Sequence, residues 1–391
     1  MKATTILAIL SLMTVHALGQ GSIDEALRTI ENNNNDIKAA KALYEARSME
    51  ARAANTLGDT SVEYEKMFGV KGADGETGKV TVTQELEFPT IYATRGKVTK
   101  QRANSYMLQY EETRRDILLT AKELCIDLVT LRRQNALIKE KLANIARLRE
   151  AGERRLAAGE ITAIDYNKVK MQEMEENAAL TLNVNEIDKT MRMLAAINGG
   201  REIDVADCDL GKCSPLPDFE ALSDEVMASD ASLMRSISEH KAADAELRLQ
   251  RNKWLPSLSL SYIREMHPTD ADNGIEIGVS LPLWNNARTV RQARANKAYA
   301  MYVSQSVHDN VSEDMRRSYD EADNLRQSLQ AYDTALVHDN IDMLKRALDS
   351  GQISTIDYFT EVNSLYGMLQ TYHTLRGNYE KALARLYKHR L

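Results

Sequence analysis

The distribution of proline constrains the fold of this 391-residue chain more than any other feature. None of the six prolines falls within residues 90–214 or within residues 283–391. Because proline costs about 3 kcal/mol in the interior of a helix, its absence allows both intervals to be nearly all helix.

Apolar residues recur every three or four positions within both intervals, which is typical of a coiled-coil seam. In the first interval the stripe consists of Ile117, Ala121, Leu124, Leu128, Leu131, Ile138, Leu142 and Ile145, with Asn135 as its polar interruption. In the second it consists of Ala322, Leu325, Leu329, Tyr332, Leu336 and Met343, interrupted by Asp339. We expect a continuous helix over residues 95–156, which would be roughly 90 Å long at 1.5 Å per residue.

Four shorter segments alternate apolar and polar residues, which is the period of a β-strand. They are residues 60–68, 80–88, 257–263 and 275–283. Stretches rich in turn-forming residues separate the first segment from the second and the third from the fourth, so the sequence predicts two β-hairpins. Each strand would have one apolar face and one polar face, as in Val80 and Val82 opposite Thr81 and Thr83.

Residues 1–19 have the pattern of a secretory signal, with Lys2, an apolar run and the small residues Ala17 and Gly19 before an expected cut near Gln20. No cysteine lies near that cut, so the sequence does not support lipid attachment there. No later segment approaches ~20 consecutive apolar residues, so we expect any membrane crossing to use strands.

The remaining composition gives little indication of catalysis or of a cofactor. The net charge of −7 argues against a nucleic-acid partner, because phosphate binding requires clustered positive charge. The seven histidines are scattered without an HExxH motif, and neither a P-loop nor GxGxxG occurs. Cys208 and Cys213 could form a disulfide in an oxidising compartment, whereas a metal site at this pair lacks a second Cys or His pair. We therefore expect no enzymatic activity, metal or cofactor.

The stretch "GEITAIDY" at residues 159–166 recurs as "GQISTIDY" at residues 351–358. The strand-to-helix stretches "LEFPTIYATRGKVTKQRANSY" and "LPLWNNARTVRQARANKAY" also resemble each other. These repeats indicate an internal duplication, in which each half has the order helix, strand, strand, long helix, turn, helix. The expected parts are a first repeat at 20–199, a linking segment at 200–217 and a second repeat at 218–391, with turns near 157–162 and 349–354 and hairpins near 60–88 and 255–283.

This arrangement resembles the TolC-type outer-membrane efflux protein family over essentially the whole mature chain. The resemblance is carried by the duplication, by "IDEAL" from Ile23, "WLPSLSLSY" at 254–262 and "LPLWNNAR", and by the paired "GEIT" and "GQIS" turns. It implies a mainly α fold with a small β part, in which a homotrimer with four strands per protomer forms one outer-membrane β-barrel. A long periplasmic α-helical barrel would continue that β-barrel.

The same resemblance implies a function in a Gram-negative envelope. The protein would be the channel, or exit duct, of a tripartite efflux system, and would pass substrates from an inner-membrane transporter and a periplasmic adaptor to the exterior. Outer-membrane lipid would surround its strands. The sequence leaves the substrate open among metal ions, drugs and other small solutes.

The family's adaptor-docking positions fall on the two helix-turn-helix tips. They match Leu156, Gly159, Ile161, Thr162, Leu348, Gly351, Ile353 and Ser354. These residues could serve only to make the turns, because Gly permits a left-handed conformation and Thr or Ser caps the returning helix. That explanation does not cover Ile161 and Ile353, since exposed apolar residues on a turn favour contact with a partner.

The family's periplasmic gate position matches Asp357, with Asp165 as its counterpart in the first repeat. A trimer would place three Asp357 carboxylates around one axis, where like charges repel and can bind cations. A second acidic ring is open, because Thr360 occupies its register and Glu361 lies beside it. Asp357 could instead be an N-terminal helix charge favoured by the helix dipole.

Arg95 and Arg288 follow the strands where the chain would leave the membrane, either near lipid headgroups or simply at a helix start. Two other classes of protein remain open. A passive porin-like channel would not need long helices that end in paired turns, and a periplasmic coiled-coil scaffold would not need hairpins with apolar faces.

Overall fold

The computed structural model describes residues 22–68, 77–205, 215–267, 270–282 and 286–391. The expected signal segment at residues 1–19 lies outside the described residues. The same is true of Cys208 and Cys213, so their disulfide stays a prediction.

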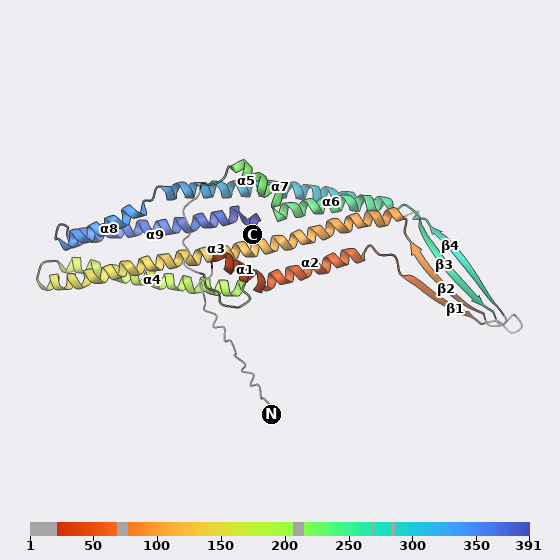
Figure 1. The fold of residues 1–391 in the computed structure, drawn as a ribbon, viewed down its shortest axis with the longest axis horizontal. Helices are drawn as coiled ribbons and strands as arrows, with labels where there is room; N and C mark the ends of the chain where they lie inside the picture. The colour runs from red at the N-terminus through yellow and green to blue at the C-terminus, as the bar shows by residue number, and fades with distance from the viewer. Residues whose placement is uncertain (1–21, 69–76, 206–214, 268–269, 283–285) are drawn as a thin grey trace, which may run out of the picture. The chain divides into compact units, whose positions relative to one another are not determined.

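The described chain is mostly helical and contains one small sheet (Figure 1). The first half contains α1 (Ile23–Asn33), α2 (Asn35–Ala53), β1 (Thr60–Met67), β2 (Thr77–Leu86), α3 (Pro89–Ala157) and α4 (Ala163–Ile197). The second half contains α5 (Phe219–Ser229), α6 (Ala231–Asn252), β3 (Ser257–Met266), β4 (Ala271–Ser280), α7 (Asn286–Gln330), α8 (Thr334–Asp349), α9 (Thr355–Leu386) and the 3₁₀ helix η1 (Lys388–Arg390).

The long helix predicted in the first proline-free interval is confirmed as α3, which runs for 69 residues without a break. Pro89 is its first residue, where the missing proline N–H has no intrahelical partner to lose. Among the described residues, no helix combines the length and the apolar character that a membrane span requires.

The second proline-free interval differs from the prediction, because its helix stops after Gln330 and restarts as α8. The Asp333 side chain caps the new helix by accepting a 3.0 Å hydrogen bond from the amide of Leu336. The break changes which face is buried: Val337 and Ile341 are buried, whereas Leu336 and Met343 are 55 % and 50 % exposed. The predicted continuous seam through Leu336 and Met343 is therefore wrong beyond Tyr332.

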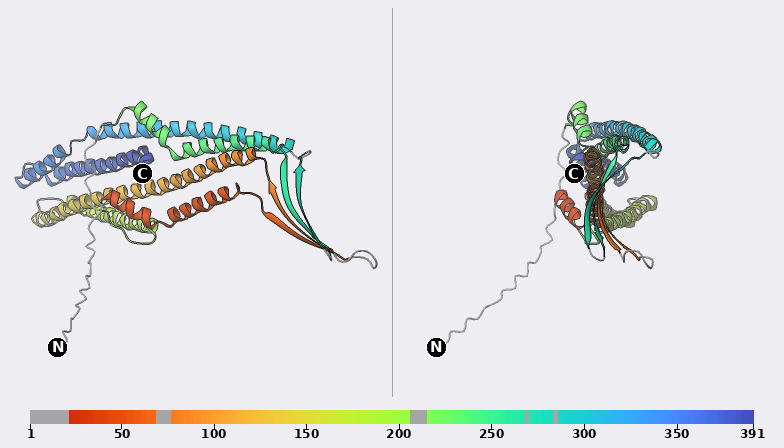
Figure 2. Two further views of the ribbon diagram at one scale, coloured as in Figure 1. Left: turned by 45° about the vertical axis from the view of Figure 1, so that its right-hand side comes forward. Right: turned by 90° about the vertical axis from the view of Figure 1, so that its right-hand side faces the viewer.

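The four predicted strands are confirmed and form one antiparallel sheet in the order β1-β2-β3-β4. Both predicted hairpins are present, and the β2–β3 pairing joins them into the single curved layer seen in Figure 2. The register aligns one apolar row across all four strands, consisting of Val62, Val82, Tyr262 and Ile275. It aligns a polar row beside it, consisting of Ser61, Thr83, Ser261 and Glu276.

The chain divides into two compact units, each of which combines segments from both halves of the sequence. The tip unit comprises the described residues of Met1–Asn34, Ile117–Pro215 and Glu321–Arg385. The strand unit comprises those of Asn35–Asp116, Leu216–Asp320 and Leu386–Leu391.

The core of the tip unit lies among α3, α4, α8 and α9. Its buried residues are Leu137, Ile145, Leu148, Val169, Val337, Ile341, Tyr358, Val362, Tyr366 and Leu369. The structure also explains the polar interruption at Asn135. Its side-chain amide donates a 2.7 Å hydrogen bond to Asn183 on α4, and Asn183 in turn donates to the carbonyl of Leu131. Both asparagines are thus satisfied inside the helix pair.

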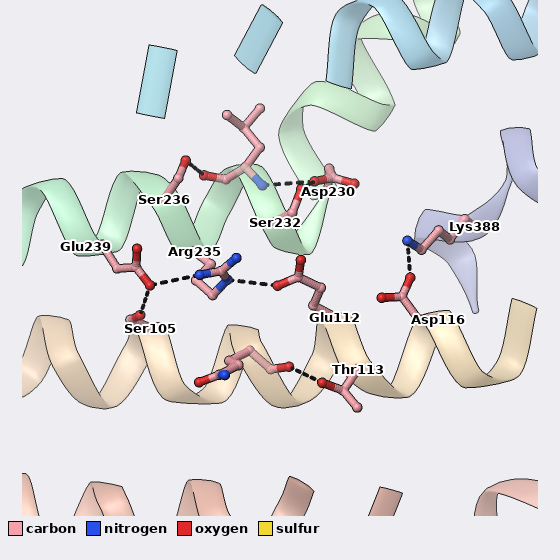
Figure 3. A network of polar contacts seen from close by, with 12 residues as sticks. Ser105, Glu112, Thr113, Asp116, Asp230, Ser232, Arg235, Ser236, Glu239 and Lys388 are labelled. Carbon is pink, nitrogen blue, oxygen red and sulfur yellow. Dashed lines mark hydrogen bonds and ion pairs between the residues drawn. The ribbon is translucent and has the colours of Figure 1, made fainter. Parts of the chain in front are cut away.

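In the strand unit, a polar network joins α3 to α6 (Figure 3). Arg235 donates to Glu112 at 2.8 Å and to Glu239 at 3.0 Å, and Ser105 donates to Glu239 at 3.1 Å. Burial lowers the pKa of Arg235, but the hydrogen bond and the charge of Glu112 outweigh this, so its pKa is raised. The guanidinium therefore stays charged between two carboxylates.

Candidate functional site: the two helix-turn-helix tips

Gly159 and Gly351 reverse the chain at the ends of α3 and α8. Their φ angles are +75° and +71°, in the left-handed region that favours glycine. Each amide donates a 3.0 Å hydrogen bond back into the preceding helix, Gly159 to the carbonyl of Leu156 and Gly351 to that of Leu348. A Cβ at either glycine would meet no atom within 4 Å, so the backbone conformation, not a lack of space, requires glycine.

The returning helices begin with matching caps. The hydroxyl oxygen of Thr162 accepts from the amide of Asp165 at 3.2 Å, and the Asp165 carboxylate accepts from the Thr162 amide, which completes a capping box. The Ser354 oxygen likewise accepts from the Asp357 amide at 3.1 Å, and its hydroxyl donates to the Asp357 carboxylate at 2.6 Å. Both aspartates therefore stabilise helix starts, whatever further role they have.

The apolar residues exposed at the tips are not those that the sequence indicated. Ile161 and Ile353 are half-buried, and Ile353 packs with Leu348 against the core of the tip unit. Ile164 is instead 70 % exposed and Ile356 is 36 % exposed. Each lies in the first turn of its helix, one residue before the capping aspartate. The repeated "IDY" in both turns carried the signal for these two isoleucines.

Both tips lie in the tip unit, and together they line one cavity of about 360 Å³. The guanidinium of Arg155 on α3 donates a 2.8 Å hydrogen bond to the hydroxyl of Thr355 on α9 and so connects the two turns. The apolar part of the lining comes from both turns and consists of Ile161, Tyr166, Val169, Ile356 and Phe359. The polar part includes Glu160 and Asp165. This cavity, which we call the tip groove, is lined by both apolar and charged side chains, a combination that suits a protein segment as its ligand.

The predicted gate residues lie near the start of the returning helices. Asp357 and Glu361 are both exposed and lie four residues apart on α9, on one face of that helix. Asp165, on α4, is partly buried within its capping box. Within the described part of the chain, no cluster of His, Cys, Asp or Glu side chains has an arrangement that could hold a metal ion.

Sequence reasoning missed an exposed apolar stripe on α4. It consists of Ile164, Met171, Met174, Leu182 and Met193, which are between 45 % and 70 % exposed. The opposite face of α4 buries Val169 and Leu194. Because the helix is apolar on two faces, its periodicity alone does not separate the core face from the uncovered one.

The small antiparallel sheet, the long helices and their paired turns form a fold that solved outer-membrane channels share. Solved structures with a similar fold include the outer-membrane channel OprN, with a TM-score of 0.77 and 10% identity over 94% of this chain and 89% of OprN. They also include CusC, with a TM-score of 0.76 and 13% identity over 94% and 91% of the two chains. The open state of the Neisseria gonorrhoeae MtrE outer-membrane channel has the same TM-score and identity, over 94% and 88%.

Residues 222–389 match the family model of the outer membrane efflux proteins. A comparison with curated proteins by sequence finds no match. The family match and the shared fold confirm the resemblance to the TolC-type outer-membrane efflux protein family that the sequence predicts.

Proposed function

We propose that this protein is the outer-membrane exit duct of a tripartite efflux system, which passes substrates from an inner-membrane transporter and a periplasmic adaptor to the exterior. The observation that carries this proposal is the match of residues 222–389 to the outer membrane efflux proteins, on a chain whose fold agrees with outer-membrane channels over 94% of its length. The duct itself would catalyse no reaction.

The exposed apolar face of the sheet supports a position in the membrane. Eight side chains on this face are between 41 % and 76 % exposed, namely Val62, Tyr64, Leu258, Leu260, Tyr262, Ile275, Ile277 and Val279. Such a surface is unfavourable in water and favourable against lipid. The proposal is that the four strands of each protomer join those of two others in a single outer-membrane β-barrel.

The α4 stripe supports a homotrimer. The part of this stripe that extends from Met171 to Met193, beyond the turn, is expected to be covered in the assembled protein. The proposed occupant is a neighbouring copy of this chain within a periplasmic helical barrel. The matching order of elements in the two halves supports the proposed duplication of the chain. The duplication would let each protomer contribute two similar helical hairpins.

The tip groove supports adaptor docking. It combines half-buried Ile161 with exposed Ile356, and Ile164 is exposed on the first tip. We assign contact with the adaptor to this groove and its two turns. The gate role of Asp357 and Glu361 is part of the same proposal, and a trimer would bring three copies of each carboxylate to the periplasmic entrance.

Membrane fractionation tests the proposed function. We expect a detergent-extracted trimer from the outer-membrane fraction, and a soluble periplasmic monomer would contradict the proposal in favour of a coiled-coil scaffold. Crosslinking from Ile164→Cys and Ile356→Cys should then capture a periplasmic adaptor, with Asn177→Cys on α4 as a control outside the turns. An intact trimer that conducts solutes but captures no adaptor would favour a passive porin-like channel.

A further inference from the structure

The ends of three helices next to the strands are strongly basic. These ends are residues 89–102 of α3, residues 241–253 at the end of α6, and residues 286–297 of α7, all within the strand unit. Together they contain twelve lysines and arginines but only two carboxylates, although the whole chain has a net charge of −7. We call the cations of these three segments the basic collar.

Most of the collar is not neutralised within the protomer. Its two carboxylates are already engaged: Glu246 pairs with Arg102 at 3.2 Å, and Asp244 pairs with Lys297 at 2.6 Å and with Arg248 at 2.7 Å. Eight of the twelve collar cations are exposed and form no ion pair with another described residue. They are Lys97, Lys100, Lys241, Arg251, Lys253, Arg288, Arg291 and Arg294. Of the two junction arginines, Arg95 is paired with Glu87, whereas Arg288 belongs to these eight.

Part of the collar lines a groove of about 400 Å³ between α3 and α6. Lys97 lies on its α3 side, and Lys241 and Arg251 lie on its α6 side. The lining also includes the Asp244 carboxylate, which is already paired with Lys297 and Arg248, and Asn252 donates a 3.0 Å hydrogen bond to Thr94 across the groove. Three unpaired cations around one groove suit a phosphate group, because lysine supplies a point charge and arginine can donate two parallel hydrogen bonds.

We propose that this groove and the basic collar around it bind the phosphate groups of anionic phospholipids at the surface of the membrane. The inference rests on the proposed function, which places the strands in the membrane. Two observations favour a lipid over a soluble anion. The chain runs from the collar into strands whose apolar face is exposed, and Trp254, between α6 and β3, is 65 % exposed. Tryptophan at such a junction is typical of the membrane–water interface.

A lipid titration of the full-length protein in neutral detergent tests the proposal. The thermal unfolding midpoint is measured with short-chain phosphatidylglycerol, with phosphatidylcholine of the same chain length, and with inorganic phosphate at matched ionic strength. We expect only phosphatidylglycerol to raise the midpoint. Each cation near an anionic surface changes affinity about fivefold, so Lys97→Gln/Lys241→Gln/Arg251→Gln should raise the required lipid concentration on the order of 100-fold.

A matched variant controls for the loss of three positive charges. Arg28→Gln/Lys139→Gln/Arg154→Gln removes three exposed cations of the tip unit that, like those of the groove, form no ion pair with another described residue, and it should respond to phosphatidylglycerol like the wild type. An equal response to phosphatidylcholine or to inorganic phosphate, or an equal loss in the control variant, would overturn the proposal. Membrane fractionation of the wild type is a separate measurement. A wild type that fractionates with the outer membrane but does not respond to phosphatidylglycerol refutes the lipid site alone.

Discussion

The phenolic hydroxyl of Tyr358 donates a 3.0 Å hydrogen bond to Oδ1 of Asn144, which joins α9 to α3 across 214 residues of sequence. Both residues are buried, with Tyr358 only 1 % exposed. Tyr366 repeats the arrangement further along α9 and donates to Glu140 at 3.1 Å. Burial raises the pKa of both tyrosines, so both hydroxyls remain protonated donors. Two polar contacts thus align these helices within an otherwise apolar core.

Replacing Tyr358 should show what this contact contributes. Tyr358→Phe leaves the Asn144 side chain buried without its donor, so we expect a loss of about 1–3 kcal/mol in the free energy of unfolding. Chemical denaturation in detergent measures this loss. Tyr299→Phe, at a tyrosine that is 72 % exposed, removes the same atom from the surface and should change little. Equal effects of the two substitutions would contradict a role for the buried hydrogen bond.

The turn glycines allow a second test with an internal control. Gly159→Ala and Gly351→Ala should each cost about 1–2 kcal/mol, because both residues have positive φ and no space limits the new Cβ. Gly367→Ala, within α9, also adds a Cβ in open space but at a helical φ. It should be neutral or stabilise by up to about 1 kcal/mol. Thermal unfolding measures whether the two turn variants are less stable than Gly367→Ala. A destabilising Gly367→Ala would contradict positive φ as the cause of the difference.

The α4 stripe predicts a difference between assembly and protomer folding. Leu182→Glu places a charge in the middle of the exposed stripe, so it should dissociate the proposed trimer while leaving the helical circular dichroism of the protomer unchanged. Light scattering after detergent extraction measures the assembly. Asn177→Glu adds the same charge on the same helix outside the stripe and should leave the trimer intact. A trimeric Leu182→Glu variant would mean that the stripe faces something other than a neighbouring copy.

The contact between α5 and the C-terminal residues should depend on pH. Glu225 accepts hydrogen bonds from Arg390 at 2.8 Å and from His389 at 2.9 Å, and these bonds, with that from Arg390 the larger cause, lower the pKa of Glu225 to about 2. A carboxylate with a lowered pKa stabilises the folded state above its ordinary pKa near 4.5. That stabilisation is lost as the pH falls from 4.5 toward 2.

The thermal unfolding midpoints of the wild type and Glu225→Gln check this dependence between pH 7 and pH 3. The wild type should unfold at a higher temperature than the variant above pH 4.5, and the difference should shrink below it. Glu220→Gln removes a charge from the same helix, where the described residues supply no ion pair, and should show a smaller difference at pH 7. A difference between wild type and Glu225→Gln that does not change with pH would contradict the ion pair as its cause.

Elements that depend on local periodicity could be predicted well. The strand faces follow from alternation within a few residues, so the sequence alone predicts an apolar face for each strand, and the structure aligns these faces in the row of Val62, Val82, Tyr262 and Ile275. The predicted turns at Gly159 and Gly351 agree with the structure for the same reason, since only glycine adopts their φ without strain.

Local periodicity could not predict the helix break before α8, nor which isoleucines of the two turns are exposed. Asp333 is a capping residue only because the helix stops before it, and in an unbroken helix it would be one more surface charge. Likewise, both isoleucines of each turn are apolar, and only packing against the core decided that Ile353 is half-buried and Ile164 exposed.

The sequence by itself therefore determined the helical intervals, the strand faces and the glycine turns, because each depends on the conformational preferences of neighbouring residues. Only the tertiary structure decided that Asn135 pairs with Asn183, and that Asn144 pairs with Tyr358. It also decided that both turns line one groove, and that cations of α3 and α6 line a second groove. Those arrangements bring together residues that are distant in sequence, and the period of a single segment contains no information about which other segment packs against it.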